Sequence, residues 1–280
     1  MNTLKTGVLL IVLTLMLIWV GGALGGRQGM IFAFTFALII NFGSYWFSDK
    51  IVLKMYKAQP VTEAQAPKLY GMVKELAKEA KIPVPGVYIV NNSSANAFAT
   101  GRSPEHAAVC VTSGIMDILS GEELKGVIAH ELAHIKNRDT LIMTVAATVA
   151  GAIMMMANMA RWAALFGGYG RGRDRGGNIF GLIAISIIAP IAAIVVQMAI
   201  SRSREYAADK RGSKIAHSGM GLASALRKLE QAAKHKRLPA SPQTAHLFIV
   251  NPLKGGFVAN LFSTHPPIDE RVKRLEQLSS

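Results

Sequence analysis

The chain has 280 residues, of which 51% are hydrophobic, and its 31 basic and 17 acidic residues give a net charge of +14. This hydrophobic content is high for a soluble protein, and the basic excess suits the cytoplasmic face of a membrane with its anionic headgroups. Nucleic acid is not an expected partner, because zinc-finger spacing, RNP-like stretches and aromatic-interleaved basic runs are absent from the sequence. The single cysteine, Cys110, excludes an intramolecular disulfide and a cysteine-based zinc site.

Four apolar runs contain no charged residue, and they lie at 7–25, 30–47, 141–160 and 179–200. Each is about long enough to cross the hydrocarbon core of a bilayer, so the sequence predicts four transmembrane helices in two hairpins. The alternative for each run is a helix buried in a protein core. A cleaved signal peptide is disfavoured for the first run, because a second apolar run follows within a few residues.

The four runs divide the chain into an N-terminal hairpin (1–47), a soluble piece (48–139), a second hairpin (140–200) and a second soluble piece (201–280). The two soluble pieces together have the size of one domain, so the second hairpin is predicted to be an insertion within it. Lysines and arginines follow each hairpin, and the positive-inside rule therefore places both soluble pieces in the cytoplasm. Arginines in the loop at 161–175 conflict with this rule, so incomplete crossing by the second hairpin stays open.

In the first soluble piece, apolar residues at helical spacing predict a helix over 63–81, which ends before Pro83. Turn residues separate short β-prone runs, and these predict strands at 87–90, 96–101 and 107–112. In the second piece the same helical spacing predicts helices at 201–216, 221–234 and 268–278. The predicted fold is therefore mainly α with a small β-sheet.

A histidine-containing helix follows the last predicted strand. Ser120 and Glu123 have the spacing of a capping box, which predicts that a helix begins there and continues through His130-Glu131-Leu132-Ala133-His134. Histidines four residues apart share one face of a helix, so both can bind one Zn²⁺. Glu131 points to the side, where it can accept a proton from a metal-bound water without binding the metal. The alternative is that both histidines are ordinary residues of the helix and bind no metal. The capping box and the apolar spacing around the motif disfavour this alternative.

A catalytic zinc site needs a third protein ligand and keeps one position open for water or substrate. Glu205 and Asp209 are spaced to share a face of the predicted helix at 201–216. Glu205 could bind the metal, and Asp209 could accept the free ring N–H of a zinc histidine. From spacing alone, a solvated face paired with neighbouring basic residues is an equal alternative.

The H-E-x-x-H motif at 130–134, Glu205-x-x-x-Asp209 and a Thr264-His265-Pro266-Pro267 element resemble the M48 membrane metalloproteases over essentially the whole chain. The resemblance implies a gluzincin-like α+β metalloprotease domain with four transmembrane helices. A related branch, the CAAX-processing proteases, has more membrane spans, so four runs disfavour it. The resemblance also implies the site roles: a general base and proton donor at Glu131, one Zn²⁺ held by His130, His134 and Glu205, and Asp209 supporting a ligand.

The same resemblance implies roles outside the zinc ligands. An edge strand would bind substrate backbone by strand addition through Asn96, Ala97, Phe98 and Ala99. His265 would approach the site and stabilise an oxyanion, with a loop histidine held by its two following prolines as the alternative. Arg271 is expected to pack through an ion pair.

The expected function is that of a multi-pass zinc endopeptidase of the bacterial inner membrane with a cytoplasmic catalytic domain. It would cleave misfolded or damaged membrane proteins in quality control under stress, and its partners would be polypeptide substrates and the lipid bilayer, with a homo-oligomer left open. Two other classes stay open: a zinc-dependent membrane hydrolase that is not a peptidase, and a membrane scaffold with a structural zinc. Glu131 disfavours the scaffold, because structural sites have four closed ligands.

Overall fold

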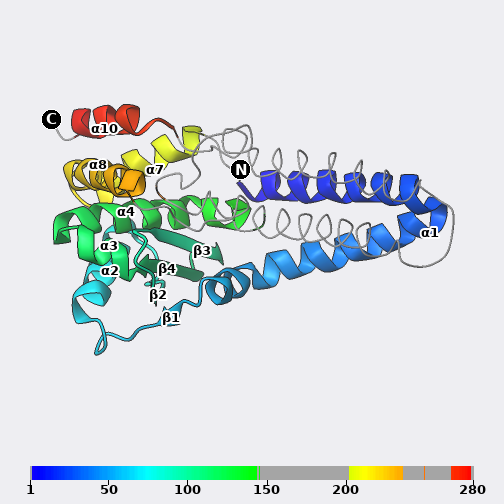
Figure 1. Ribbon diagram of the computed structural model, residues 1–280, viewed down its shortest axis with the longest axis horizontal. Coiled ribbons are helices and arrows are strands. Elements are labelled where there is room, and N and C mark those ends of the chain that lie inside the picture. The colour runs from blue at the N-terminus through cyan, green and yellow to red at the C-terminus, as the bar shows by residue number, and fades with distance from the viewer. Residues whose placement is uncertain (1, 144, 146–201, 236–248, 250–265, 279–280) are drawn as a thin grey trace.

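A mainly helical protein with one small mixed sheet is formed by residues 2–143, 145, 202–235, 249 and 266–278, which the computed structural model describes (Figure 1). Nearly all of the third and fourth apolar runs lies outside the described residues, and so does His265. Their predicted crossings of the membrane and the predicted role of His265 therefore stay predictions.

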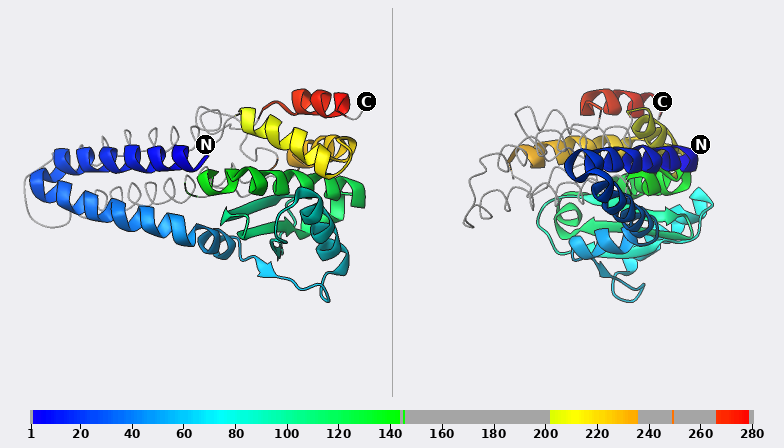
Figure 2. Two further views of the ribbon diagram at one scale, coloured as in Figure 1. Left: turned by 180° about the vertical axis from the view of Figure 1, so that it is seen from behind. Right: turned by 90° about the vertical axis from the view of Figure 1, so that its right-hand side faces the viewer.

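The first two apolar runs lie within α1 (Asn2–Met55), whose two halves run antiparallel and project away from the sheet (Figure 2). The chain reverses at Gly26, which has φ of +54°, and the Asn41 side-chain amide donates to the Thr14 hydroxyl at 2.8 Å across the pair. Among the described residues, one helical segment, Gly26–Phe47, is long and apolar enough to cross a membrane. Large apolar side chains are exposed along both halves, which is unusual for a soluble surface.

The sheet has the strand order β1-β2-β4-β3, built from β1 (Gln59–Pro60), β2 (Gly86–Val90), β4 (His106–Thr112) and β3 (Ala97–Ser103). β2 and β4 are parallel, and the two outer pairs are antiparallel. The three predicted strands are confirmed, whereas the two-residue β1 is too short to leave a periodic pattern. β3 lies at one edge of the sheet, and among the described residues no strand pairs with the outer side of its backbone.

Two separate cores lie on the two faces of the sheet. Val109 and Val111 of β4 point into the larger core, which the helices share, while Cys110 between them packs with Phe98 and Val52 on the opposite face. This alternation follows from the two-residue repeat of a strand. Burial raises the pKa of the Cys110 thiol well above its usual range, so this cysteine stays a neutral core residue.

The predicted helices are present as α2 (Pro67–Ala80), α7 (Arg202–Ile215), α8 (Met220–His235) and α10 (Ile268–Gln277), with a short α3 (Ser113–Ile118) before the motif helix. The predicted start of the first helix at residue 63 is wrong, because residues 62–66 form a turn in which Gln65 accepts the N–H of Thr62. Pro67 then occupies the first turn of α2, where a backbone N–H would have no hydrogen-bond partner within the helix.

The motif helix α4 (Gly121–Asn137) lies between the sheet and the layer formed by α7, α8 and α10 (Figure 1). Its predicted capping box is confirmed: the Glu123 N–H donates to the Ser120 hydroxyl at 3.4 Å, and the Ser120 N–H donates to the Glu123 carboxylate at 2.8 Å. Every residue from 126 to 135 is buried. Polar side chains in this stretch must therefore find partners inside the protein.

The buried Glu123 carboxylate also ties α4 to α8. It accepts the Ser224 hydroxyl at 2.6 Å and the Lys228 ammonium at 2.8 Å. Burial alone would raise the pKa of Glu123, but the hydrogen bonds from Lys228, Ser224 and Ser120 outweigh it and lower this pKa from 4.5 to about 2. The ionised carboxylate therefore stabilises the fold fully above about pH 4.5, and this stability is lost as pH falls toward 2.

We expect Glu123→Gln to lower the free energy of unfolding by about 2 kcal/mol at neutral pH, the scale of a lost charge-assisted hydrogen bond. The difference from the parent chain should shrink between pH 4.5 and pH 2. Thermal denaturation in detergent, followed by circular dichroism at several pH values, measures this. A difference that stays constant down to pH 2.5 would contradict the role given to the ionised form.

Candidate metal centre

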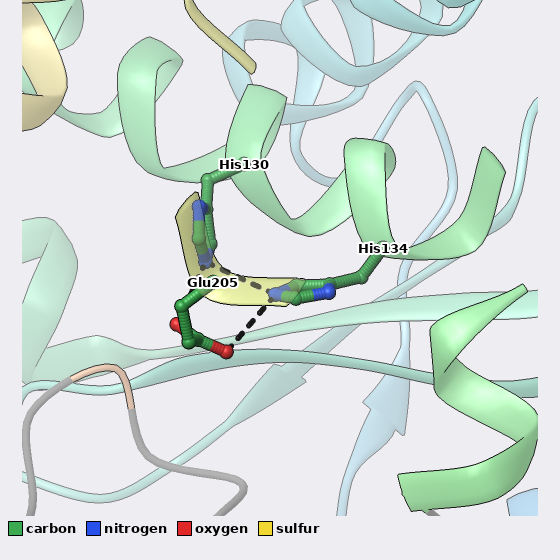
Figure 3. Close-up of side chains that lie close together, drawn as sticks. All are labelled: His130, His134 and Glu205. Atoms are coloured by element: carbon green, nitrogen blue, oxygen red, sulfur yellow. Dashed lines mark hydrogen bonds and ion pairs between the residues drawn. The ribbon is translucent and has the colours of Figure 1, made fainter. Parts of the chain in front are cut away.

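Three potential ligands meet in the interior between α4 and α7 (Figure 3). The Nε2 atoms of His130 and His134 are 3.2 Å apart, His134 Nε2 is 3.5 Å from Glu205 Oε1, and His130 Nε2 is 3.7 Å from Glu205 Oε2. Tetrahedral zinc with ligand bonds of about 2.0–2.1 Å places its ligand atoms about 3.3 Å apart. The three side chains are buried and their spacing therefore fits one Zn²⁺.

The position of Glu205 depends on close packing of α7 against α4. Gly212 lies two turns after Glu205, and a Cβ atom there would sit 3.0 Å from the backbone N and Cα of His130. Glycine thus permits this close approach, whereas a Cβ atom would crowd the backbone of α4 at His130. Glu205 and Asp209 are 1% and 2% exposed, so the alternative of a solvated, ion-paired face is wrong.

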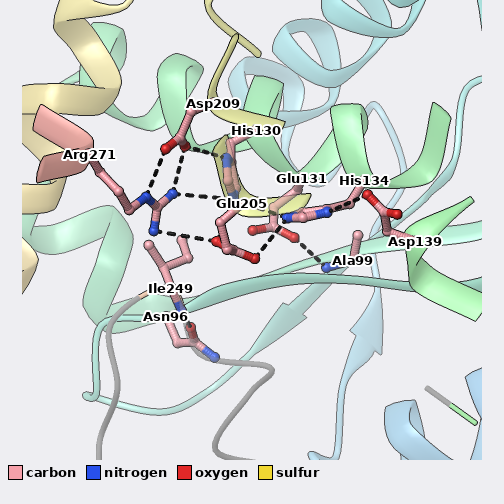
Figure 4. Close-up of polar contacts among 10 residues, drawn as sticks. All are labelled: Asn96, Ala99, His130, Glu131, His134, Asp139, Glu205, Asp209, Ile249 and Arg271. Atoms are coloured by element: carbon pink, nitrogen blue, oxygen red, sulfur yellow. Dashed lines mark hydrogen bonds and ion pairs between the residues drawn. The ribbon is translucent and has the colours of Figure 1, made fainter. Parts of the chain in front are cut away.

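Behind His130 lies a pair of buried opposite charges (Figure 4). His130 Nδ1 is 2.9 Å from Asp209 Oδ1, and the Arg271 guanidinium donates to both oxygens of Asp209, from Nε at 2.9 Å and from Nη2 at 2.7 Å. Burial alone would raise the pKa of Asp209, but Arg271 and His130 hold it below its usual range. An ionised Asp209 at this distance is placed where it can orient the His130 ring, so its predicted supporting role stays a prediction. The predicted ion pair of Arg271 is therefore present, and it lies at the centre itself.

His134 has an equivalent carboxylate partner that sequence reasoning missed. Its Nδ1 atom is 3.1 Å from Asp139 Oδ2, and Arg204 Nε is 3.9 Å from the other oxygen of Asp139. Arg138 ends α4 with φ of +58°, and this left-handed residue turns the chain so that Asp139 comes back to the ring. Asp139 could have been proposed from the sequence, because the second ring nitrogen of a metal-binding histidine usually contacts a carboxylate or a carbonyl group.

The Asp139 contact is also electrostatic. Burial alone would lower the pKa of His134, but the hydrogen bond that its ring donates to Asp139 and the charges of Glu205 and Glu131 raise this pKa to about 9 in the metal-free protein. A histidine that binds a metal must lose this proton, so metal binding should release it.

We expect Asp139→Asn to weaken zinc binding by about 10- to 100-fold, because the ring of His134 loses the carboxylate that orients it. Competition with a chromophoric chelator measures the dissociation constant. Asp117→Asn, an exposed carboxylate on α3, is the matched control and should leave it unchanged. Equal zinc affinity in the two variants would show that Asp139 does not support the ligand.

Glu131 lies beside the three ligands without belonging to them. Its Oε2 atom accepts the backbone N–H of Ala99 on β3 at 2.8 Å, a contact between the motif helix and the edge strand that sequence reasoning also missed. Burial raises the pKa of Glu131 above its usual range, although His130 and His134 oppose the shift. A carboxyl group with a raised pKa suits a residue that accepts a proton and later returns it.

The predicted substrate strand is placed at the sheet edge next to Glu131, and all four of its proposed residues are buried. Ala97 and Ala99 face the α4 side of the sheet, whereas Phe98 points to the other face and packs on the ring of Tyr56, the residue directly after α1, with centroids 5.1 Å apart. The side chain of Asn96 accepts the N–H of Ile249 at 3.2 Å (Figure 4). Substrate binding by this strand stays a prediction. Because the side chains are buried, the backbone of the strand is the part suited to bind a substrate.

The fold and the site define the class of protein. An H-E-x-x-H helix whose two histidines meet a glutamate from a later helix, with a carboxylate beside them, is the arrangement of a peptidase that works with a metal. The chain belongs to peptidase family M48, whose family model matches residues 63–279.

Known proteins of this kind resemble the chain over nearly its full length. It is 56% identical over 278 residues to the Protease HtpX homolog of Syntrophobacter fumaroxidans, with 98% of each chain covered. It is 55% identical over 276 residues to the Protease HtpX homolog of Pyrococcus furiosus, covering 98% of this chain and 95% of that one. The chain is thus similar to HtpX-type proteases throughout.

The fold is also found in a solved structure. The crystal structure of Ste24p from S. mikatae matches with a TM-score of 0.54 at 17% identity, over 94% of this chain and 62% of the Ste24p chain. The chain therefore spans less than two thirds of Ste24p, and at this identity the likeness concerns the fold alone. It agrees with the predicted mainly α fold with a small sheet, while the described residues hold one candidate membrane span rather than four.

Proposed function

We propose that the chain is a membrane-embedded zinc endopeptidase that cleaves misfolded or damaged membrane proteins at the cytoplasmic face. The observation that carries the proposal is the buried meeting of His130, His134 and Glu205, with Glu131 beside them. These groups fit one Zn²⁺ and leave a carboxyl group free for proton transfer.

Each residue of the site would have its own role in peptide hydrolysis. His130, His134 and Glu205 would hold the zinc, which when bound acidifies a water molecule and polarises the scissile carbonyl. Glu131 takes the proton from the attacking water and passes it to the leaving amine. The outer edge of β3, which pairs with no strand among the described residues, would hold the substrate backbone as an added strand. His265, which lies outside the described residues, is our proposed donor to the oxyanion.

The proposed location rests on hydropathy and charge. The exposed apolar segment Gly26–Phe47 supports embedding in a membrane, and Lys50, Lys54 and Lys57 follow it on the side of the catalytic domain. By the positive-inside rule this side is cytoplasmic. The third and fourth apolar runs directly follow and precede the helices that carry the site, so the centre would work close to the bilayer. Substrates would then be membrane proteins with cytoplasmic segments, in quality control under stress.

Zinc content and casein cleavage of the purified protein in detergent test the proposal together. We expect about one zinc per chain, cleavage that a chelator removes, and recovery when zinc is added back. Bound zinc without any hydrolysis would support a scaffold, and zinc-dependent hydrolysis of other bonds alone would support a different hydrolase. Equal cleavage of soluble and membrane-embedded unfolded substrates would contradict the proposed preference for membrane proteins.

A further inference from the structure

The far end of β3 bends toward the membrane hairpin at a glycine. Gly101 has φ of +135°, and a Cβ atom there would collide with the carbonyl oxygen of His106 on β4. The pairing of β3 with β4 shifts register between Gly101 and Ser103, which marks a bulge. A bulge redirects the side chains that follow it. Here the guanidinium carbon of Arg102 lies 4.9 Å from the centroid of the Trp46 ring on α1.

Trp46 lies at the boundary of the candidate membrane span. The span ends at Phe47, and the Lys50 ammonium, one turn further on, lies 5.9 Å from the Phe47 ring. Trp46 and Phe47 are 43% and 47% exposed, although both are large aromatic residues. Aromatic rings followed by cations are typical of the level at which a membrane protein passes through the headgroups.

The cations at this boundary have no acidic partners in the described part of the chain. Neither Lys50 nor Arg102 forms an ion pair there, whereas Arg204 and Arg271 near the catalytic centre do. Asp49 is adjacent to Lys50 in the sequence, but no ion pair joins them. Arg102 therefore lies against the exposed Trp46 ring, and Lys50, four residues after Trp46 on α1, lies against the neighbouring Phe47 ring.

We propose that this headgroup site, defined by Trp46, Lys50 and Arg102, binds the phosphate of an anionic phospholipid. The two cations supply the charge complementarity, and the indole ring lies at the depth where headgroups meet the acyl chains. The bound lipid would hold β3 at the membrane surface, because Arg102 is three residues from Ala99, about 10 Å along the strand. The catalytic edge strand would then have a fixed depth relative to the bilayer. Lipid binding does not depend on the proposed peptidase activity.

Quenching of Trp46 fluorescence by brominated lipids tests the site directly. The chain has three tryptophans, so the Trp19→Phe, Trp162→Phe background leaves Trp46 as the only indole. In vesicles that contain this protein, we expect Trp46 to prefer brominated phosphatidylglycerol over brominated phosphatidylcholine by about 25-fold, since each of the two cations near an anionic surface contributes about a fivefold preference. High salt should reduce the preference.

Two double variants with the same change in net charge locate the effect. Lys50→Gln with Arg102→Gln should abolish the preference, while quenching by brominated phosphatidylcholine stays unchanged and shows that the helix is still inserted. Lys68→Gln with Lys78→Gln, both exposed on α2, should keep it. Equal quenching by the two lipids in the parent chain would overturn the site. So would a preference that survives in the first double variant or disappears in the second.

Discussion

We expect Glu131→Gln to reduce peptide cleavage by about 10²- to 10⁴-fold without loss of zinc, the range that a positioned general base contributes. The amide has nearly the shape of the carboxylate, and its oxygen can still accept the Ala99 N–H that Glu131 accepts at 2.8 Å. It cannot take a proton from water. The fold and the metal ligands should therefore survive while proton transfer is lost.

The measurement combines turnover of a fluorogenic peptide with zinc content determined on the same sample. Glu122→Gln, an exposed glutamate on the same helix, is the matched control and should keep full activity. Glu205→Gln should lose zinc and activity together, because it removes a ligand. Full activity of Glu131→Gln would remove Glu131 from the mechanism, and loss of zinc from this variant would show that it helps to hold the metal.

Local features of the sequence predicted the motif helix well. The Ser120 capping box and the apolar spacing of α4 depend on residues within a few positions, and both are present in the structure. The strands β2, β3 and β4 were likewise marked by β-prone runs between turn residues. Glu205 could be proposed as a ligand, but spacing could not distinguish a buried helix face from a solvated one. The distinction needed the packing of α7 on α4.

The missed features are contacts between distant parts of the chain. The bond from Ala99 to Glu131 depends on how an edge strand lies against a helix. The ring of Phe98 packs on Tyr56 because α1 continues to Met55, beyond the candidate span that ends at Phe47. Asp139 is near His134 in sequence, yet its contact requires the left-handed turn at Arg138. A single non-glycine residue with positive φ leaves no clear sequence pattern, so such turns are found only in the structure.

We expect Arg271→Ala to lower the free energy of unfolding by about 3–5 kcal/mol, the cost of leaving a buried charge without its partner. Arg271 is fully buried and donates two hydrogen bonds to Asp209, and its Nη1 atom is 3.5 Å from Glu205. Without it, two buried carboxylates lose their positive neighbour. Lys273→Ala, an exposed residue on the same helix, should change stability by less than about 0.5 kcal/mol.

A double variant separates this electrostatic cost from lost packing. Asp209→Asn with Arg271→Met removes both charges and keeps most of the volume, so it should be less destabilised than the sum of the single variants. Denaturant titrations of the zinc-free protein in detergent give the four free energies of the cycle. Because Asp209 also orients His130, the double variant should still bind zinc more weakly even where stability recovers. Additive losses would mean that Arg271 and Asp209 act independently. Unchanged zinc affinity would mean that neither Asp209 nor Arg271 supports the metal centre.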